Sequence, residues 1–337
     1  EMFGALPFPD FHIHAVKNAR SPVSAIDHNG DDVLAAIERR DRQYPANVRP
    51  LEYLGFAEEH SIICDFGDLP KAKQMLLLLT GWINWGSATI NMAAAQSKLV
   101  GSIYLQVINS RGEWETAIPH LGFPAGIDKT ATIDLTGKFL TNDYRVKITT
   151  NFEIYWDRIL ISTDNDEIPM TITSLKLQSA DLHWHGYSQT YSPDGRLPLL
   201  YDYDNVIETA PYGHHAEGRF TQYGDVRSLL EASDNQYVIM SHGDEISVSF
   251  DARGAPEVAP GWKRDFILYS SGWIKDGDHN TAFSNTVAPM PFHGMSGYPY
   301  PSAERYPFDL ANIQYMQQYN TRRLGFGVRS SDFGFRN

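Results

Sequence analysis

The sequence predicts an all-β protein that consists of two jelly-roll-like β-sandwich units with short helices and extended termini. In residues 127–163, IDKTATIDLTGKFLTNDYRVKITTNFEIYWDRILIST, apolar and polar side chains alternate with a period of two, which is the pattern of half-buried strands. Asn142-Asp143 and Asn151 supply turn residues between these runs, so we expect consecutive antiparallel strands of a sandwich here. The 26 Gly and 19 Pro residues suit many short strands joined by tight turns.

Composition limits the classes of partner. With 337 residues and 42% apolar side chains, the chain is long enough for two domains with hydrophobic cores. Its net charge of −13 comes from 28 basic and 41 acidic residues, and no run of Lys and Arg occurs. We therefore expect neither a nucleic acid nor an anionic membrane as partner. The longest apolar run, residues 75–79, is far shorter than the roughly 20 residues that span a bilayer, so no membrane-spanning segment is expected.

Cys64 is the single cysteine of the chain. An intrachain disulfide and cysteine-based zinc or iron–sulfur sites are therefore excluded, and cysteine usage does not fix the compartment. The chain begins at Glu1 without a visible signal-peptide pattern, so we expect a processed form or a fragment of a longer protein.

Residues 1–60 are predicted to be an N-terminal extension with a short helix. EMFGALPFPDFHIHAV is rich in Pro and aromatic residues, which is typical of an extended segment. Asp31 or Asp32 then begins a helix that runs to about Arg40, before Pro45.

Residues 61–166 are predicted to be the first sandwich. Its strands are SIICDFGD, QMLLLLTGWINWG, GSIYLQVINS, GEWETAI and the runs of residues 127–163. QMLLLLTGWINWG has a continuous apolar run, so we expect a central strand that is buried on both faces. Asn109, Ser110 and Arg111 join the next two strands, which suits a hairpin.

Residues 167–290 are predicted to be a second β-rich unit. The boundary falls at Asp164-Asn165-Asp166-Glu167 and Pro169, because four polar residues and a Pro interrupt the alternation. The predicted strands are TITSLKLQSADLHWHGY, NQYVIMSH, DEISVSFDA and KRDFILYSSGWI, with a short helix at residues 225–231.

Residues 291–337 are predicted to be a C-terminal extension with a short helix. Residues 275–308 are dense in Pro, Gly and aromatic residues and therefore indicate a loop. Asp309 is the expected N-cap of a helix over LANIQYMQQY, and the tail beyond it is expected to fray or to lie on a neighbour.

His183 and His185, in LHWHG, are candidate ligands for copper or zinc. Two residues that lie two apart on a strand point to the same face, and His214 and His215 would complete a site. An HWHG string resembles the copper-binding signature of multicopper oxidases, but a blue-copper site needs a cysteine between histidines, and Cys64 has no histidine neighbour. The favoured alternative is a solvent-facing or ring-stacked histidine pair.

Two acidic loops are candidate calcium sites, because their oxygen-bearing residues follow the one-three-five spacing of calcium loops. The candidate ligands are Asp276, Asp278 and Asn280 in KDGDHNT, and Asp27, Asn29 and Asp31 in DHNGDD. Neither loop has the distal Glu of an EF-hand, and DG and NG pairs are also common turn formers, so plain turns are the favoured alternative.

No catalytic residues are predicted. The sequence contains no GxSxG elbow, HExxH motif, phosphate-binding glycine loop or GxGxxG fingerprint, so we expect a protein that is not an enzyme. Glu153 and Asp157 could face a sugar as a carboxylate pair, but we favour an outward Glu153 and an Asp157 that anchors a turn or Arg158. The tryptophans that could form sugar-stacking platforms, or else lie in the core, are Trp82, Trp85, Trp114, Trp262 and Trp273.

Several strings of this sequence resemble the C-terminal region of large bacterial proteins that carry FG-GAP-type propeller repeats, often with tetratricopeptide repeats and an ASPIC/UnbV segment, and that are similar to cartilage acidic protein. The strings are LLLLTGWINWGSATINMAAAQ, LGFPAGIDKTATIDLTGKFL, YRVKITTNFEIYWDRILIST, YGDVRSLL, GWKRDFILYSSGWIKDGDHNT and TVAPMPFHGMSGYPYP, within residues 50–322. The resemblance implies a secreted or periplasmic, non-catalytic module of a longer polypeptide or complex. The calcium loops of that family lie in its propeller, so the resemblance implies neither calcium nor catalytic residues for this region.

The leading hypothesis is therefore a non-catalytic binding or assembly module that acts outside the cytoplasm. Its expected partners are other protein chains or other domains of the same assembly, because the Pro-rich and aromatic ends need a surface on which to lie. The alternatives are a metal-dependent enzyme that uses copper or zinc at the histidines, and a carbohydrate-binding module whose ligands are glycans.

Overall fold

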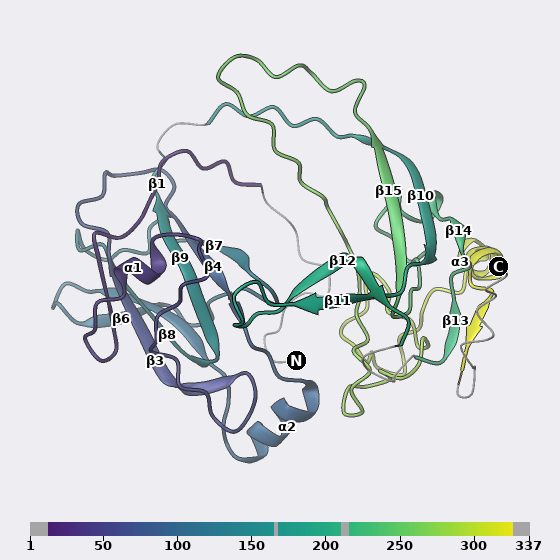
Figure 1. The fold of residues 1–337 in the computed structure, drawn as a ribbon, viewed down its shortest axis with the longest axis horizontal. Helices are drawn as coiled ribbons and strands as arrows, with labels where there is room; N and C mark the ends of the chain where they lie inside the picture. Colours follow the sequence, from purple (N-terminus) through teal and green to yellow (C-terminus); the bar gives the residue numbers. More distant parts are fainter. Residues whose placement is uncertain (1–12, 165–167, 210–215, 326–337) are drawn as a thin grey trace. The chain divides into compact units, whose positions relative to one another are not determined.

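The structure, a computed structural model, describes residues 13–164, 168–209 and 216–325 (Figure 1). These residues divide into two compact units. The first unit contains residues 13–164, 168–170 and 194–198, and the second contains residues 171–193, 199–209 and 216–325. The division after Met170 lies close to the boundary that the polar run before Pro169 predicts. Predictions for residues 1–12, 165–167, 210–215 and 326–337, which include His214 and His215, lie outside the described residues.

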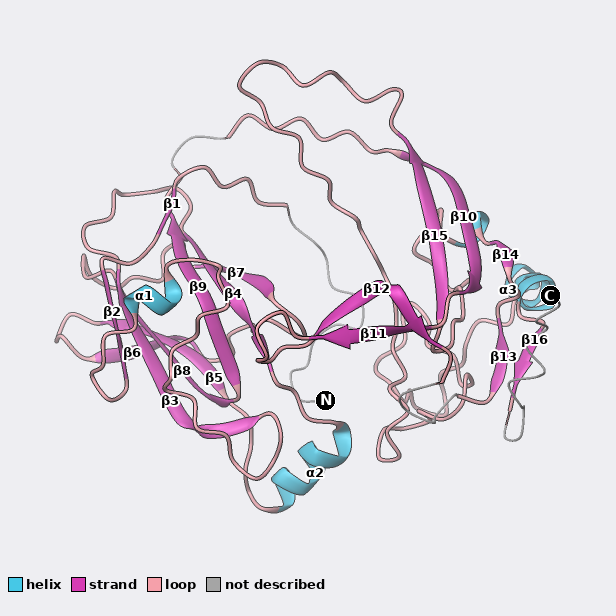
Figure 2. Ribbon diagram, in the orientation of Figure 1, coloured by secondary structure: helices cyan, strands magenta, loops and turns pink. Residues whose placement is uncertain are grey.

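The first unit is a sandwich-like pair of antiparallel sheets (Figure 2). The five-stranded sheet has the order β2-β3-β8-β5-β6, with bounds Ser24–Asp27, Phe56–Asp65, Arg145–Phe152, Ile103–Ile108 and Trp114–Ile118. The four-stranded sheet has the order β1-β9-β4-β7, with bounds Ala19–Arg20, Ile154–Ser162, Leu76–Ile83 and Lys129–Asp134. Every strand that the sequence predicts between residues 61 and 163 is present in this unit.

The strands of residues 127–163 do not pair with one another, so the expected run of consecutive partners is wrong. β7 and β9 pair with β4 in one sheet, whereas β8 pairs with β3 and β5 in the other. The chain therefore crosses between the sheets at each of these connections, which buries one face of every strand against the opposite sheet. The predicted hairpin of β5 and β6 is confirmed, and Asn109 accepts hydrogen bonds from the backbone N–H groups of Arg111 and Glu113 in its turn.

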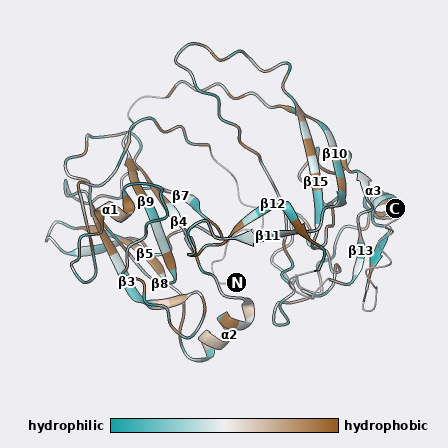
Figure 3. Cartoon of the chain, viewed as in Figure 1, coloured by the Kyte–Doolittle hydropathy of each residue, from teal (hydrophilic) through white to brown (hydrophobic). Residues whose placement is uncertain are grey.

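The hydrophobic core of the first unit lies between its two sheets. Leu77 and Leu79 of β4, Ile159 and Ile161 of β9, and Val146 of β8 are fully buried in one cluster. β4 is buried along nearly its whole length, as its continuous apolar sequence predicts. In Figure 3 brown, hydrophobic stretches alternate with teal, hydrophilic ones along strands such as β9. Burying one such side chain contributes about 1.5–3 kcal/mol, so this cluster is the main source of stability in the unit.

A β-bulge interrupts the pairing of β4 with β9. Thr80 lies opposite Arg158 and Gly81 lies opposite Trp156, so Asp157 is the extra residue. A Cβ atom on Gly81 would lie 2.4 Å from the backbone oxygen of Tyr155, so only glycine fits at this position. The bulge turns Asp157 toward the segment that precedes Tyr44, which it contacts through hydrogen bonds described below.

The predicted N-terminal extension is part of the sandwich rather than separate from it. Its residues supply β1, β2 and helix α1, Leu34–Ile37, and Ile37 is fully buried in the core. The N-cap of this helix is Val33, so the predicted aspartate cap is wrong, although Asp32 Oδ1 accepts a hydrogen bond from the backbone N–H of Leu34 over 2.9 Å. The helix ends before Arg40, and is therefore shorter than predicted.

Helix α2, Ala88–Gln96, is absent from the predictions. The Ser87 hydroxyl accepts a hydrogen bond from the backbone N–H of Ile90 over 3.4 Å, in the manner of an N-cap. Ser87 and the alanine-rich string ATINMAAAQ are the signal that identifies this helix in the sequence.

The second unit is β-rich and contains three small sheets. A three-stranded sheet has the order β14-β10-β15, with bounds Gly224–Asp225, Lys176–Trp184 and Asp244–Asp251. Two antiparallel ribbons pair β11 with β12 and β13 with β16, with bounds Tyr187–Tyr191, Leu200–Ile207, Gly218–Phe220 and Arg322–Leu324. The short 3₁₀-helix η1, Arg227–Leu229, replaces the helix predicted at residues 225–231.

Helix α3, Leu310–Tyr319, covers one face of the three-stranded sheet. Tyr315 of α3 packs in the same buried cluster as Ala180 and Leu182 of β10. Asp309 accepts a hydrogen bond from the backbone N–H of Asn312 over 2.8 Å, so the predicted helix and its cap are confirmed. The described part of the predicted C-terminal extension therefore belongs to the second unit.

Two predicted strands of the second unit are wrong. NQYVIMSH and KRDFILYSSGWI lie in neither a helix nor a strand. Their β-branched and aromatic residues favour a strand locally, but a strand needs a partner along its backbone, and no strand within residues 13–164, 168–209 and 216–325 pairs with either string. Residues 275–308 lack helices and strands, as predicted.

The all-β class is confirmed, and the jelly-roll assignment of the two units stays a prediction. Across the described ranges, no helix is long and apolar enough to cross a membrane.

Candidate functional site

The histidine pair lies at the end of β10, opposite the start of β15. His183 pairs in register with Glu245, and His185 donates its backbone N–H to the carbonyl of Gly243 over 2.9 Å. His183 Nε2 lies 3.4 Å from Glu245 Oε1, and His185 Nδ1 lies 3.5 Å from Glu245 Oε2. Both imidazoles therefore lie on the same side of the sheet, as the spacing predicts, and converge on one carboxylate.

A metal site at these histidines stays a prediction. In the part of the chain that the structure describes, no group of three or more His, Cys, Asp or Glu side chains is arranged to hold a metal ion. His185 Nε2 lies 3.0 Å from the carbonyl oxygen of Tyr203, and His183 Nδ1 lies 3.2 Å from Asp181 Oδ2, so both rings are held by protein groups. Glu245 orients the two rings and forms ion pairs with them when they are protonated.

The first candidate calcium loop is a turn organised by one carboxylate. Asp27 is buried, and its Oδ1 accepts hydrogen bonds from the backbone N–H groups of Asn29 and Asp31 over 2.8 and 3.0 Å. Burial opposes ionisation of Asp27, but these hydrogen bonds outweigh it and lower its pKa. The carboxylate of Asp27 thus serves the turn, in agreement with the favoured alternative.

The second candidate calcium loop consists of successive turns of the same kind. Asp276 Oδ1 accepts the backbone N–H of Asp278 over 3.0 Å, and Asp278 Oδ1 accepts that of Asn280 over 2.8 Å. Thr281 donates its hydroxyl to Asp276 Oδ2 over 3.2 Å. These contacts are those of plain turns, and calcium binding at either loop stays a prediction.

Glu153 and Asp157 are both buried and bind different groups of the first unit, so the expected outward Glu153 is wrong. Glu153 Oε1 accepts hydrogen bonds from Asn84 Nδ2 over 3.0 Å and from the Tyr155 hydroxyl over 2.8 Å. Asp157 Oδ1 accepts the backbone N–H groups of residues 41 and 42, which confirms that it anchors a turn. Burial raises the pKa of Asp157, although these two hydrogen bonds lower it.

Aromatic residues on the outer face of β4 and β9 form a packed cluster. Trp82 stacks on Tyr155 with ring centroids 4.6 Å apart, and Tyr44 lies edge-on to both rings. Burial raises the pKa of Tyr44 to about 12, and the nearby Asp157 adds to this effect. Trp82 is therefore buried in this cluster, whereas Trp85 and Trp262 are exposed to solvent.

A buried ion pair that the sequence does not reveal joins the end of the chain to the three-stranded sheet. Arg322 of β16 contacts Asp244 of β15 through two guanidinium nitrogens, and the side chains are 13% and 0% exposed. Asp244 also accepts hydrogen bonds from the Tyr223 hydroxyl over 2.8 Å and from the backbone N–H of Ser241 over 2.7 Å. Arg322 lies over the Tyr223 ring at 4.3 Å. This network has a structural role, because its polar groups bind one another.

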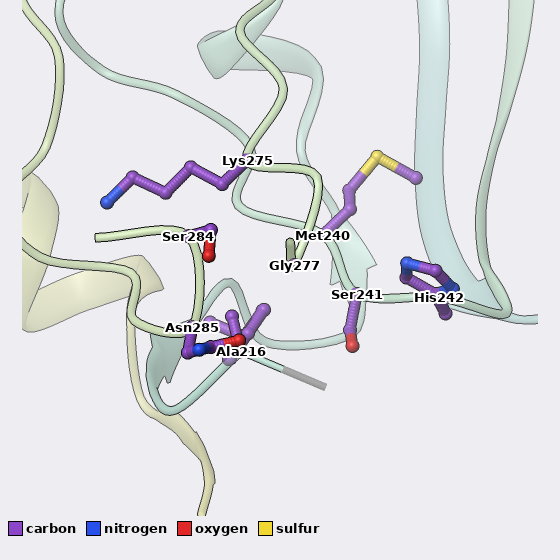
Figure 4. Close-up of a pocket in the computed structure, with 9 residues that line it drawn as sticks. Ala216, Met240, Ser241, His242, Lys275, Gly277, Ser284 and Asn285 are labelled. Atoms are coloured by element: carbon purple, nitrogen blue, oxygen red, sulfur yellow. The ribbon is translucent and has the colours of Figure 1, made fainter. Parts of the chain in front are cut away.

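A small pocket of about 60 Å³ lies in the second unit between Met240, Ser241 and His242 on one side and Ser284 and Asn285 on the other (Figure 4). Figure 4 shows the Lys275 side chain extending away from Met240 and His242, so its amine does not point at them. The pocket is lined by both polar and apolar side chains.

The amine of Lys275 is bound by backbone oxygens. It donates hydrogen bonds to the carbonyls of Thr286, Val287 and Pro289 over 2.8, 2.9 and 2.9 Å, and it lies 5.3 Å from the centre of the Tyr298 ring. Burial lowers the pKa of Lys275 to about 8. Lys275 therefore holds the loop of residues 286–289 in place and is not an exposed nucleophile.

Four consecutive apolar residues, Phe266–Tyr269, are exposed in the second unit, and we call them the apolar segment. Phe266, Ile267 and Leu268 are 74%, 68% and 68% exposed. Among the described residues, the backbone groups of these three form no hydrogen bond. The segment lies in the long loop that follows β15 in Figure 1. The sequence marks it as a strand, KRDFILYSSGWI, which is the signal that finds this site.

Comparisons with known proteins give no family for this chain: no family model, no curated protein and no solved structure matches it. The resemblance to the C-terminal region of FG-GAP proteins is therefore untested and stays a prediction.

Proposed function

We propose that this chain is a non-catalytic binding and assembly module that binds another protein chain through the apolar segment. The observation that carries this proposal is the exposure of four consecutive large apolar side chains. Exposed apolar area on this scale is costly in water and marks interaction sites in soluble proteins. Binding a partner removes this area from water and so lowers the free energy of the complex.

The chemistry of the apolar segment favours a protein as its partner. Ile267 and Leu268 are aliphatic and offer no hydrogen bond to the hydroxyl groups of a glycan. The backbone N–H and C=O groups of Phe266, Ile267 and Leu268 are available, so a partner must supply both apolar contacts and hydrogen bonds. The edge of a β-sheet with an apolar face supplies both.

A metal-dependent enzyme has less support. His183 and His185 converge on Glu245, but within the described residues this group is not arranged as a metal site. The proposed location is secreted or periplasmic, and it rests on the resemblance to the FG-GAP proteins alone.

The test compares the chain with a variant of the segment and with a matched control. The variant combines Phe266→Ser with Leu268→Ser, and the control combines Phe308→Ser with Leu310→Ser, where the side chains are 64% and 71% exposed in the same unit. We expect the wild-type chain and the control to bind the same protein, in direct binding measurements with purified components, and the segment variant to lose that binding. Equal binding by the segment variant would refute the proposal.

A further inference from the structure

Strand β15 has one paired edge and one free edge. It pairs with β10 over its full length and lies at the end of its sheet, and no other strand of the described residues pairs with it. An eight-residue strand with a free edge is a template for another strand.

The register identifies which backbone groups lie at the free edge. His185 donates its backbone N–H to Gly243, so Gly243, Glu245 and Ser247 direct their backbone groups toward β10. The alternate residues Ile246 and Val248 direct theirs away from β10, and among the described residues no backbone partner meets them.

The side chains of β15 are also incompletely covered on its apolar face. Val248 lies opposite Ala180 and Ile246 lies opposite Leu182, so this face continues the core of the three-stranded sheet. Val248 is nevertheless 41% exposed. A further strand beside β15 with large apolar side chains would extend this core and cover Val248.

We propose that the free edge of β15 accepts the apolar segment of a second copy of this chain, so that copies associate by β-strand addition. This inference rests on the proposed function, because the same segment is the binding element. Within its described residues, the second unit thus contains the backbone groups of Phe266, Ile267 and Leu268 outside any sheet and the free edge of β15, and pairing two copies joins them.

The chemistry of the two elements is complementary. In an added strand, Phe266 and Leu268 lie on one face and can cover the apolar face of β15 beside Val248. Lys263 and Arg264 precede the segment, and Glu245 and Asp251 lie near the two ends of β15, so opposite charges meet in either strand direction. If two copies each bind the segment of the other, they form a closed dimer. If each copy instead binds the segment of the next copy, head-to-tail oligomers form.

Disulfide trapping tests the proposed pairing directly. Val248→Cys is made in one preparation and Leu268→Cys in a second, carrying a tag of different size, and the two are mixed under mild oxidation. Cys64 is fully buried and burial raises the pKa of its thiol, so it does not compete. Facing residues of neighbouring strands lie within the Cα separation that a disulfide needs. We expect a mixed dimer of the two proteins; dimers joined only through two 248 positions would overturn the proposal.

Sedimentation velocity separates this inference from the proposed function. Val248→Pro removes an outward N–H that β10 does not use, and Pro is compatible with an edge strand, whereas Val248→Thr keeps the N–H as a matched control. We expect Val248→Pro to weaken self-association about tenfold and Val248→Thr to leave it unchanged.

The other outcomes of these measurements show whether this inference or the proposed function is wrong. If the Phe266→Ser and Leu268→Ser variant loses association but Val248→Pro does not, β15 is not the acceptor, and only this inference falls. A chain that stays monomeric at all concentrations also overturns the inference, while binding of a different protein through the segment would uphold the proposed function. Self-association that persists in the Phe266→Ser and Leu268→Ser variant overturns the inference, whereas the proposed function is refuted only if this variant also binds a different partner protein as well as the wild-type chain does.

Discussion

Replacing Arg322 by Ala should destabilise the second unit strongly, because it leaves the carboxylate of Asp244 charged and buried. Asp244 has 0% side-chain exposure, and without the guanidinium its donors among the described residues are the Tyr223 hydroxyl and the backbone N–H of Ser241. Breaking a buried ion pair costs about 3–5 kcal/mol. Because two neutral donors still stabilise the carboxylate, we expect the free energy of unfolding to fall by about 3 kcal/mol, at the lower end of that range.

Hydrogen exchange in β15 and β16 is the suitable assay, because two units can unfold separately and a single melting curve would mix them. A loss of about 3 kcal/mol accelerates exchange through opening of the unit by more than about 100-fold. Arg227→Ala is the matched control in the same unit, since its ion pair with Glu231 is exposed and contributes about 0–1 kcal/mol. A loss from Arg322→Ala that equals the loss from Arg227→Ala would refute the reasoning.

Three further predictions concern buried ionisable groups. Burial raises the pKa of Asp157 above its ordinary 3.8, so the folded chain binds the proton of this carboxyl more tightly than the unfolded chain does. The free energy of unfolding should therefore fall as the pH rises from about 4. Asp157→Asn should remove this dependence, which urea titrations at about pH 4 and 7 measure. Burial lowers the pKa of Lys275 to about 8, so the unfolded chain binds more protons between pH 8 and 10.5, and the stability of the second unit should rise over that window. Lys275→Met should abolish this rise and cost about 1–3 kcal/mol, because three carbonyls lose their donor. Cys64 is fully buried, so the folded chain should not react with a thiol reagent such as DTNB, and reaction should begin only as urea unfolds the first unit; fast reaction of the native chain would contradict the position of β3 in the core.

Local sequence patterns identify most strands of the first unit but not their partners. The alternation in residues 127–163 predicts β7, β8 and β9, because apolar side chains that recur at every second residue indicate a strand with one buried face. It does not state which sheet a strand joins, and the three strands alternate between the sheets. The N-cap at Asp309 is readable because a cap is a local interaction within three residues.

The candidate sites also combine contacts that the local sequence predicts with contacts that only the fold creates. The pairing of His183 and His185 on one face was predictable from their spacing, whereas Glu245 meets them only because β15 lies beside β10. The ion pair of Arg322 with Asp244 joins residues far apart in the sequence, and neither residue has a local signature. KRDFILYSSGWI has the composition of a strand, but no strand of the described residues pairs with it, so it lies outside every sheet.

Hydrogen–deuterium exchange of the backbone at Phe266, Ile267 and Leu268 tests the central claim most directly. These amides have no hydrogen-bond acceptor within the described residues, so in dilute protein they should exchange as fast as those of an unstructured peptide. At concentrations where sedimentation shows association, or in a complex with another protein, the account predicts strong protection of all three. Unchanged fast exchange in the associated state would contradict the claim that the apolar segment is the binding surface.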